Sequence, residues 1–282
     1  MAETAFQTQY RQEMIAGFEV NQSLLRDAVT TEAVIKGNQA VFLVGDSGGA
    51  TAVTRGVNGL IPGRADNLNQ NTATLIEWHD KPIKTGFNIF ASQGNQRALM
   101  QKTCMSVMNR RIDDDIITEL ATATLTLGAA TTFDLDLAVH GKTVLQNNDV
   151  PWDNNIFALI TPAAEAYLQQ VAAYTSADYI NIKPLPGGDG WSDKMKVKDW
   201  LGVKWIVHPN LPGKGTASET CFMFHRSAIG HAANTGGLMT AVGYDDEDDY
   251  SFARCSCFMG SVLMQNSGVI KVAHDGSAYV AT

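Results

Sequence analysis

Residues 34–90 most constrain what this chain can fold into, because they are rich in β-type residues and lack a helical period. A short apolar run at 41–44 breaks at the glycine-rich sequence 45–49, and residues 58–71 are rich in asparagine and glycine. Strand-like sequence returns at 72–78. The pattern predicts a long two-stranded ribbon that is too polar to have a core of its own. Such a ribbon needs another surface to lie on.

The composition is that of a globular protein, since 45% of the 282 residues are hydrophobic and 18% are charged. A formal net charge of -8 argues against a dedicated nucleic-acid-binding protein, which normally has a basic face. No apolar run approaches the roughly 18–20 residues of a membrane span, and no secretory signal is evident. Cys104, Cys221, Cys255 and Cys257 are expected to be free thiols, and no cysteine or histidine pair has zinc spacing.

The strongest helical pattern runs from about Ser92 to about Thr124. Its apolar residues recur at steps of three and four, which predicts one buried face. A continuous helix of this kind would be roughly 45–50 Å long at 1.5 Å per residue. That length exceeds the span of most compact domains, so we expect the helix to act as a spine. The predicted buried stripe consists of Leu99, Met105, Met108, Ile112, Ile116 and Leu120.

The other patterns mix helices and strands without a βαβ repeat, which predicts an α+β fold. Asp134 is expected to cap a second helix, and Thr161, followed by Pro162, a third. An N-terminal arm is expected at 3–29, with a loose helical stripe of Tyr10, Met14, Phe18 and Leu25. Strands are expected at 155–160, 203–207 and 221–224, followed by a short helix at 226–233 and closing strands at 250–254, 258–264 and 269–272. Loops are expected at 184–198 and 211–218.

Residues 45–49 spell the nucleophile motif of trypsin-like serine proteases, with Ser47 in the nucleophile position. That chemistry needs a histidine base and a buried aspartate, which in that family precede the serine. Here the first histidine is His79, downstream of Ser47, and none of the six histidines belongs to a visible catalytic set. The motif is better explained as a tight turn in which Asp46 accepts a hydrogen bond from its own backbone.

Charged residues gather at two places. On the long helix, Arg110 and Asp114, and likewise Arg111 and Asp115, stand four residues apart. They can pair along the helix surface or across a subunit boundary, and the sequence favours neither. The acidic run at 245–249 lacks the alternation and the central glycine of a calcium loop, so we expect a solvated loop rather than a metal site.

The order of these elements resembles the major capsid protein of tailed double-stranded DNA bacteriophages, with the Hong Kong-97-type fold. The resemblance covers nearly the whole chain and depends on the order of several phrases: Thr161-Pro162 with Leu168, 201–212, 222–229 and 260–270. It implies an N-terminal arm (1–33), an extended loop (34–90), a peripheral domain with the spine helix (91–129), an axial domain (130–240) and closing peripheral strands (241–282).

The resemblance implies a structural protein and not an enzyme, without cofactor or metal. Copies would form hexamers and pentamers of an icosahedral shell, assembled in the host cytoplasm and found in the virion. The shell would enclose double-stranded DNA without sequence-specific binding and without a membrane. Expected partners are a separate scaffolding protein, a portal protein and, in some cases, a decoration protein. Inter-subunit contacts are expected from Phe42, Trp78, Phe87, Phe90, Arg110, Arg111, Asp114 and Asp115.

Two other functions are weighed against this one. An encapsulin-type nanocompartment shares the fold but encloses a cargo enzyme, and the long ribbon and separate arm favour the phage protein. A serine hydrolase using Ser47 is the other alternative, and the absence of a paired base disfavours it.

Overall fold

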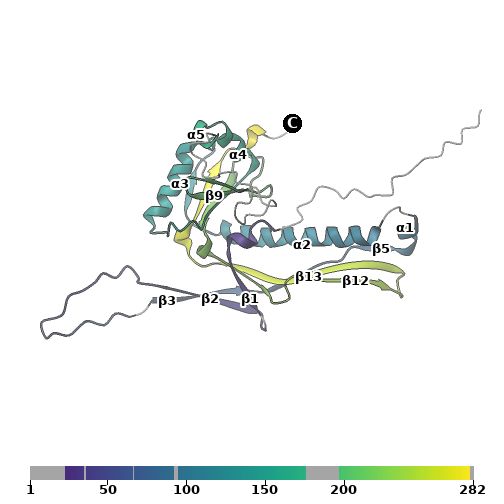
Figure 1. The fold of residues 1–282 in the computed structure, drawn as a ribbon, viewed down its shortest axis with the longest axis horizontal. Helices are drawn as coiled ribbons and strands as arrows, with labels where there is room; N and C mark the ends of the chain where they lie inside the picture. Colours follow the sequence, from purple (N-terminus) through teal and green to yellow (C-terminus); the bar gives the residue numbers. More distant parts are fainter. Residues whose placement is uncertain (1–22, 35, 66, 92–94, 176–196, 280–282) are drawn as a thin grey trace, which may run out of the picture.

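The computed structural model describes residues 23–34, 36–65, 67–91, 95–175 and 197–279. These residues form two six-stranded sheets, a two-stranded ribbon and a long helix that lies between the sheets (Figure 1). This is a mixed α+β architecture, as expected. The predicted arm helix and the glycine-rich part of the 184–198 loop lie outside the described residues.

The ribbon pairs β2 (Gln39–Asp46) with β3 (Asn67–Thr74) in antiparallel register. Its base packs on one of the sheets, and its tip projects away from both (Figure 1). It is shorter than the ribbon predicted over 34–90. Strands β4 (Ile76–Asp80) and β5 (Ile83–Thr85) hydrogen-bond to a sheet instead of to each other, and helix α1 (Gly86–Ala91) follows them. Sequence alone could not distinguish free strands from strands that join a distant partner.

The first sheet is organised around β13 (Tyr250–Leu263), a single strand where two closing strands were expected. Met259 pairs with both Ala233 and Ile76, so neighbours lie along both edges of β13. The strands of this sheet besides β4, β5 and β13 are β1 (Thr30–Val34), β11 (Ile229–Asn234) and β12 (Met239–Asp245).

Helix α2 (Gln96–Ala121) is the predicted spine, and its 26 residues give a length of about 39 Å at 1.5 Å per residue. The helix begins at Gln96, directly after its cap residue Asn95, rather than at about Ser92 as predicted. The Asn95 side chain accepts a hydrogen bond from the Ala98 N–H, which caps the first turn. Met100 and Cys104 complete its buried stripe, whereas Met105, predicted to be buried, is 39% exposed.

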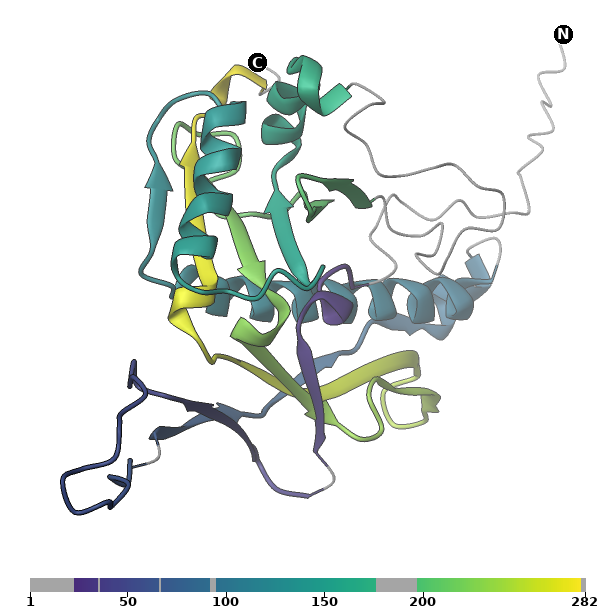
Figure 2. The same ribbon diagram turned by 60° about the vertical axis from the view of Figure 1, so that its left-hand side comes forward.

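The second sheet lies between α2 and a layer of helices (Figure 2). Phe157 and Phe224 belong to the apolar cluster that includes the inward face of α2, whereas Ala158 and Met223 face the helices. Its strands, in spatial order, are β6 (Thr126–Gly128), β14 (Val269–His274), β10 (Glu219–His225), β7 (Ile156–Ile160), β9 (Val203–Val207) and β8 (Val197–Trp200).

Two predicted helix caps are confirmed. Asp134 accepts a hydrogen bond from Leu137 N–H at the start of α3 (Leu135–Asn147). The Thr161 hydroxyl accepts one from Ala164 N–H at the start of α4 (Pro162–Gln169). A short helix, α5 (Ala172–Thr175), completes this layer. Capping depends on residues three apart, so sequence predicts it well.

The helix predicted at 226–233 is wrong. Only Arg226–Ala228 (η3) is helical, in a single 3-10 turn, and β11 follows because its backbone pairs with β1 and β13. The boundary expected between 240 and 241 falls inside β12, and β14 joins the second sheet rather than the first. Within the described ranges, further 3-10 turns are η1 (Arg26–Ala28), η4 (Asn266–Gly268) and η5 (Ser277–Tyr279).

Candidate assembly surfaces

The two faces of the ribbon differ, because successive strand residues point to opposite sides. Ala40 and Phe42 face the first sheet, where Phe42 is 8% exposed and contacts Gly230 so closely that a Cβ there would lie 2.9 Å from the ring. Because Gly230 has no side chain, it leaves the space that the Phe42 ring occupies. The structure places Phe42, expected at a subunit boundary, inside its own chain.

The opposite face of the ribbon is open and carries three exposed apolar side chains among polar ones. Val41, Leu43 and Leu68 are 52%, 60% and 56% exposed. Strand register places Leu43 beside Gln70, and Leu68 beside Gly45, on this same face. Further apolar side chains, at Val53, Val57, Leu60 and Ile61, are exposed in the loop at the ribbon tip. An apolar surface on a projecting ribbon is typical of an interaction site.

Two more of the expected contact residues meet within the chain. Trp78 lies on β4, opposite Cys257 of β13, and the Arg111 guanidinium lies 3.8 Å from the centroid of its ring. This cation–π contact ties the first sheet to α2. By contrast, Phe87 on α1 is 75% exposed and stays available to a neighbour. The side chain of Phe90 lies outside the described part of the structure.

Of the charged residues of α2 that were expected at a subunit boundary, Asp115 makes its contacts within the chain, whereas Arg110 and Asp114 are partly open to solvent. Asp115 accepts a hydrogen bond from the Ser261 hydroxyl at 2.6 Å and lies 4.0 Å from the His231 ring, so it joins α2 to the first sheet. Burial lowers the pKa of His231, which favours the neutral ring. Arg110 and Asp114 are half-buried on the helix, and their pairing across a subunit boundary stays a prediction.

Asp113 is the residue that sequence reasoning missed. It is 1% exposed, and its carboxylate accepts hydrogen bonds from the Ser23 hydroxyl and from the N–H groups of Leu24 and Leu25, the latter two at 3.0 and 3.2 Å. The His208 ring lies 3.4 Å away. Asp113 thus fixes the start of the described chain on the middle of α2. Its partners stand about 90 positions away, so no local pattern could reveal them.

Ser47 lies in the expected turn. The Gly48 N–H donates to the Asp46 carboxylate at 2.7 Å, and Gly48 and Gly49 have φ of 59° and 73°. These positive angles explain the two glycines. Among the described residues, the hydrogen bonds of Ser47 involve its carbonyl and no histidine. The turn therefore accounts for the motif without catalytic chemistry.

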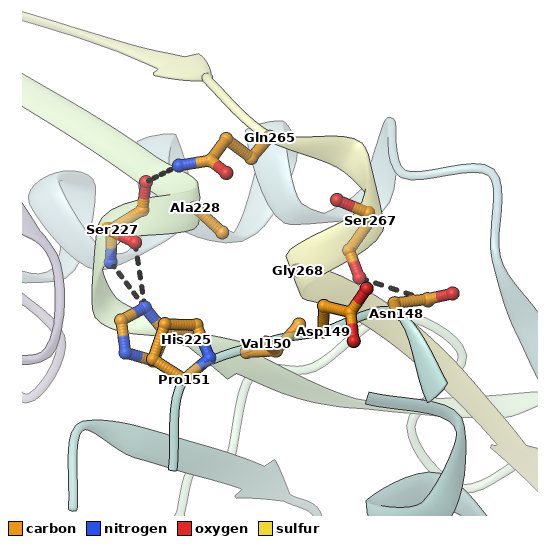
Figure 3. Close-up of a pocket in the computed structure, with 10 residues that line it drawn as sticks. All are labelled: Asn148, Asp149, Val150, Pro151, His225, Ser227, Ala228, Gln265, Ser267 and Gly268. Atoms are coloured by element: carbon orange, nitrogen blue, oxygen red, sulfur yellow. Dashed lines mark hydrogen bonds between the residues drawn. The ribbon is translucent and has the colours of Figure 1, made fainter. Parts of the chain in front are cut away.

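A small pocket of about 50 Å³ lies where the chain crosses between the sheets (Figure 3). His225 ends β10 there, with Nδ1 2.7 Å from the Ser227 hydroxyl and Nε2 2.9 Å from the Asp153 carboxylate. Hydrogen bonds from the Asn155 side chain and from His225 lower the pKa of Asp153 to about 2.

The order Ser227–His225–Asp153 matches that of a hydrolase relay, but its geometry is that of a helix cap. The Ser227 N–H donates to the same His225 nitrogen at 3.2 Å, so the ring closes the turn that begins η3. Gln265, next to η4, donates to the Ser227 carbonyl at 3.4 Å. The cluster therefore joins η3 and η4, the two turns at which the chain passes from one sheet to the other.

The acidic run at 245–249 forms the turn between β12 and β13. Asp245 accepts a hydrogen bond from the Glu247 N–H, which closes the turn. Within the described ranges, no group of three or more histidine, cysteine or acidic side chains is placed to hold a metal ion. No described helix has the length and hydropathy to cross a membrane.

Solved structures similar to this chain are capsid structures and phage structures. A structure of Mycobacterium phage Che8 aligns with a TM-score of 0.72 at 13% identity, covering 96% of this chain and 98% of the other. The capsid of a native GTA particle aligns with a TM-score of 0.72 at 10% identity (97% and 96% covered), and that of Ralstonia phage GP4 with 0.68 at 12% (99% and 98%).

The TM-scores over nearly the whole chains establish a shared fold, which is the Hong Kong-97-type fold predicted from the order of elements. None of the curated proteins compared with the chain matches it. The model of the family described as phage capsid protein matches residues 2–276, nearly the whole length. The chain therefore belongs to the phage capsid protein family, whose members are structural proteins of the virion.

Proposed function

We propose that copies of this chain close into an icosahedral shell, and that the open face of the ribbon is buried against a neighbouring copy. The observation that carries the proposal is the apolar strip formed by Val41, Leu43 and Leu68 on a ribbon that projects from the molecule. The opposite face is already used by its own sheet, so only the open face is left for a partner.

A contact between a projecting ribbon and a different surface of the next copy is heterologous, and such contacts form a ring when the rotation between successive copies closes. Burial of apolar surface stabilises a contact by about 25 cal/mol per Å², so the few side chains of one contact contribute a modest free energy. The contact repeats at every subunit, so the closed shell is far more stable than one contact. Hexamers and pentamers are the rings that an icosahedral shell requires.

We further propose that the shell encloses double-stranded DNA without sequence-specific binding. The net charge of -8 supports this, because like charges oppose tight binding to the phosphate backbone. A separate scaffolding protein, a portal protein and, where present, a decoration protein are the proposed partners, with assembly in the host cytoplasm. Phe87 and the ribbon tip are the proposed contacts outside the ribbon face.

The proposed domain division follows the sheets. The second sheet and its helices would form the axial domain, and the first sheet with α2 the peripheral domain. The extended loop is then the part between β1 and β4, and the arm is the chain before β1. The two-sheet arrangement supports this assignment over boundaries drawn from sequence.

Electron microscopy of the purified protein, alone and with a candidate scaffolding protein, tests the proposal. Leu43→Lys should reduce the yield of closed particles at least tenfold while the subunit stays folded. Val139→Lys is a matched control, because Val139 is 39% exposed on α3, far from the ribbon. Normal shells from Leu43→Lys would contradict the proposed contact. Particles that hold a protein cargo instead of DNA in infected cells would favour the nanocompartment.

A further inference from the structure

Two cysteine side chains that are far apart in the sequence meet where α2 packs on β13. Cys104 on α2 and Cys255 on β13 are 0% and 1% exposed, and their thiols are hydrogen-bonded to one another. The Cys104 sulfur also lies 3.2 Å from the carbonyl oxygen of Asp80, the residue that pairs with Cys255 across the sheet. The two sulfur atoms are therefore held in contact at the junction of the spine helix and the first sheet.

The other two cysteines have partners of a different kind. Cys257 lies two residues further along β13, and its thiol donates to the Asn234 side chain at 3.7 Å. Cys221 lies on β10, in the second sheet, where it is hydrogen-bonded to Thr161. All four cysteines are free thiols in the structure. A disulfide needs two sulfur atoms that can approach to about 2.05 Å, and the contact between Cys104 and Cys255 places that pair closest to this requirement.

The surroundings of the pair keep it reduced while the chain is made. Burial raises the pKa of both thiols, so little of the reactive thiolate is present at neutral pH. Glutathione and thioredoxin also keep thiols reduced inside a cell, whereas the surface of a released virion meets oxidising conditions. A virion protein passes from the first environment to the second, so the state of a thiol pair in contact can change at that step.

We propose that Cys104 and Cys255 form a disulfide in the released particle, with a peroxide as the oxidant. One sulfur, as its thiolate, attacks a peroxide oxygen, the O–O bond breaks, and the departing hydroxide takes the thiol proton and leaves as water. The second sulfur attacks the resulting sulfenic acid, the S–O bond breaks, and a second water leaves with the other thiol proton. Two thiols and one hydrogen peroxide thus give one disulfide and two waters.

The bond would tie α2 to the central strand of the first sheet across about 150 positions of sequence. It would lock the spine helix onto that sheet after assembly, when the subunits no longer need to rearrange. The setting in a released particle rests on the proposed shell, whereas the contact between the two sulfur atoms belongs to the single chain. The chemistry can therefore be tested on the subunit as well as on particles.

Mass spectrometry of the full-length wild-type chain tests the proposal. Folded subunits and particles are treated with hydrogen peroxide, remaining thiols are alkylated in denaturant, and peptides are analysed without reductant. A peptide pair that joins Cys104 to Cys255 is expected. Trypsin leaves Cys255 and Cys257 on one peptide, so Cys257→Ala identifies the partner and should give the same link. Absence of the link, or equal linking of Cys104 to Cys255, Cys257 and Cys221, would overturn the proposal.

Thermal unfolding gives a second readout. After peroxide treatment, a thiol reductant should lower the unfolding midpoint of wild type and of Cys257→Ala by about 5 °C or more, because a bond across a long loop restricts the unfolded chain. Cys255→Ala undergoes the other oxidations but cannot close the bond, so its midpoint should not respond to the reductant. An equal response in Cys255→Ala, or none in wild type, would refute the proposal. Particle formation is scored separately by microscopy, so failure of the disulfide is distinct from failure of assembly.

Discussion

Replacing Phe42 by alanine should release the base of the ribbon from its own sheet. The ring is 8% exposed and packs among Ala40, Ala73 and Ala232, in a small cluster separate from the main core. A buried aromatic side chain covers 150–250 Å², so at about 25 cal/mol per Å² its burial is worth about 4–6 kcal/mol. The small cluster at the ribbon base can relax, so we expect a cost of about 3 kcal/mol, at the low end for such truncations.

That cost should appear mainly as local opening, because the ribbon can detach while the sheets stay intact. About 3 kcal/mol corresponds to roughly 100-fold faster exchange of amides in β2 and β3, at a factor of ten per 1.4 kcal/mol. Hydrogen exchange on the dilute, unassembled subunit measures it. Amides in α3 and β7 serve as internal references, since these elements pack in the two larger apolar clusters and not in the small cluster of Phe42.

Leu43→Ala is the matched control, because Leu43 is the next residue on the same strand but is 60% exposed on the opposite face. It should leave exchange in the free subunit unchanged and weaken only assembly. If both variants accelerate ribbon exchange equally, or if neither does, the assignment of the two faces is wrong.

Three further predictions concern the rest of the fold. Gly260→Ala should prevent recovery of folded protein, because a Cβ at Gly260 would lie 2.1 Å from the Thr74 carbonyl oxygen. Gly63→Ala is the control and should be neutral, because a Cβ at Gly63 would have no other atom within 4 Å. Equal soluble yields of the two variants would contradict this prediction. Thr161→Ala should cost about 1–2 kcal/mol through loss of the α4 cap, measured as the shift in denaturant midpoint, and no shift would argue against the cap. Burial lowers the pKa of His231 and His274, so their neutral rings stabilise the fold above about pH 6.5 and this stability is lost on acidification below that value. The denaturant midpoint should therefore fall between pH 7.5 and pH 5.5, less so in His274→Gln, and a constant midpoint would exclude this source of acid sensitivity.

The sequence predicts the parts of the fold that depend on near neighbours. Asp134 and Thr161 cap helices through residues three positions away, and the buried strand at β7 is a plain apolar run. The order of elements was enough to indicate the fold family. The length of the spine helix was overestimated at both ends, although the apolar stripe predicted from Leu99 to Leu120 lies within the observed helix.

The parts that sequence could not predict depend on distant partners. Phe42 and Trp78 are aromatic residues in a polar segment, which suggested inter-subunit anchors. Phe42 packs on Gly230 of the same chain, whereas Trp78, which contacts Arg111, is half-buried, and its contact with a neighbouring subunit stays a prediction. Asp113 is one of several acidic residues on α2, and only the folded chain brings Ser23 to it. Of the expected contacts, Phe87 is the described aromatic side chain that is plainly open to a neighbour.

The central position of β13 has a consequence for synthesis of the chain. Strand β13 joins β4, β5, β11 and β12, yet it is translated after all of them. Roughly 130 residues separate the end of α2 from β13, so at 5–20 residues per second the ribosome needs about 6–26 s to supply it. During that time the nascent ribbon has no completed sheet to hold it. A chain that ends before β13 therefore lacks the strand that joins the surface on which the ribbon packs.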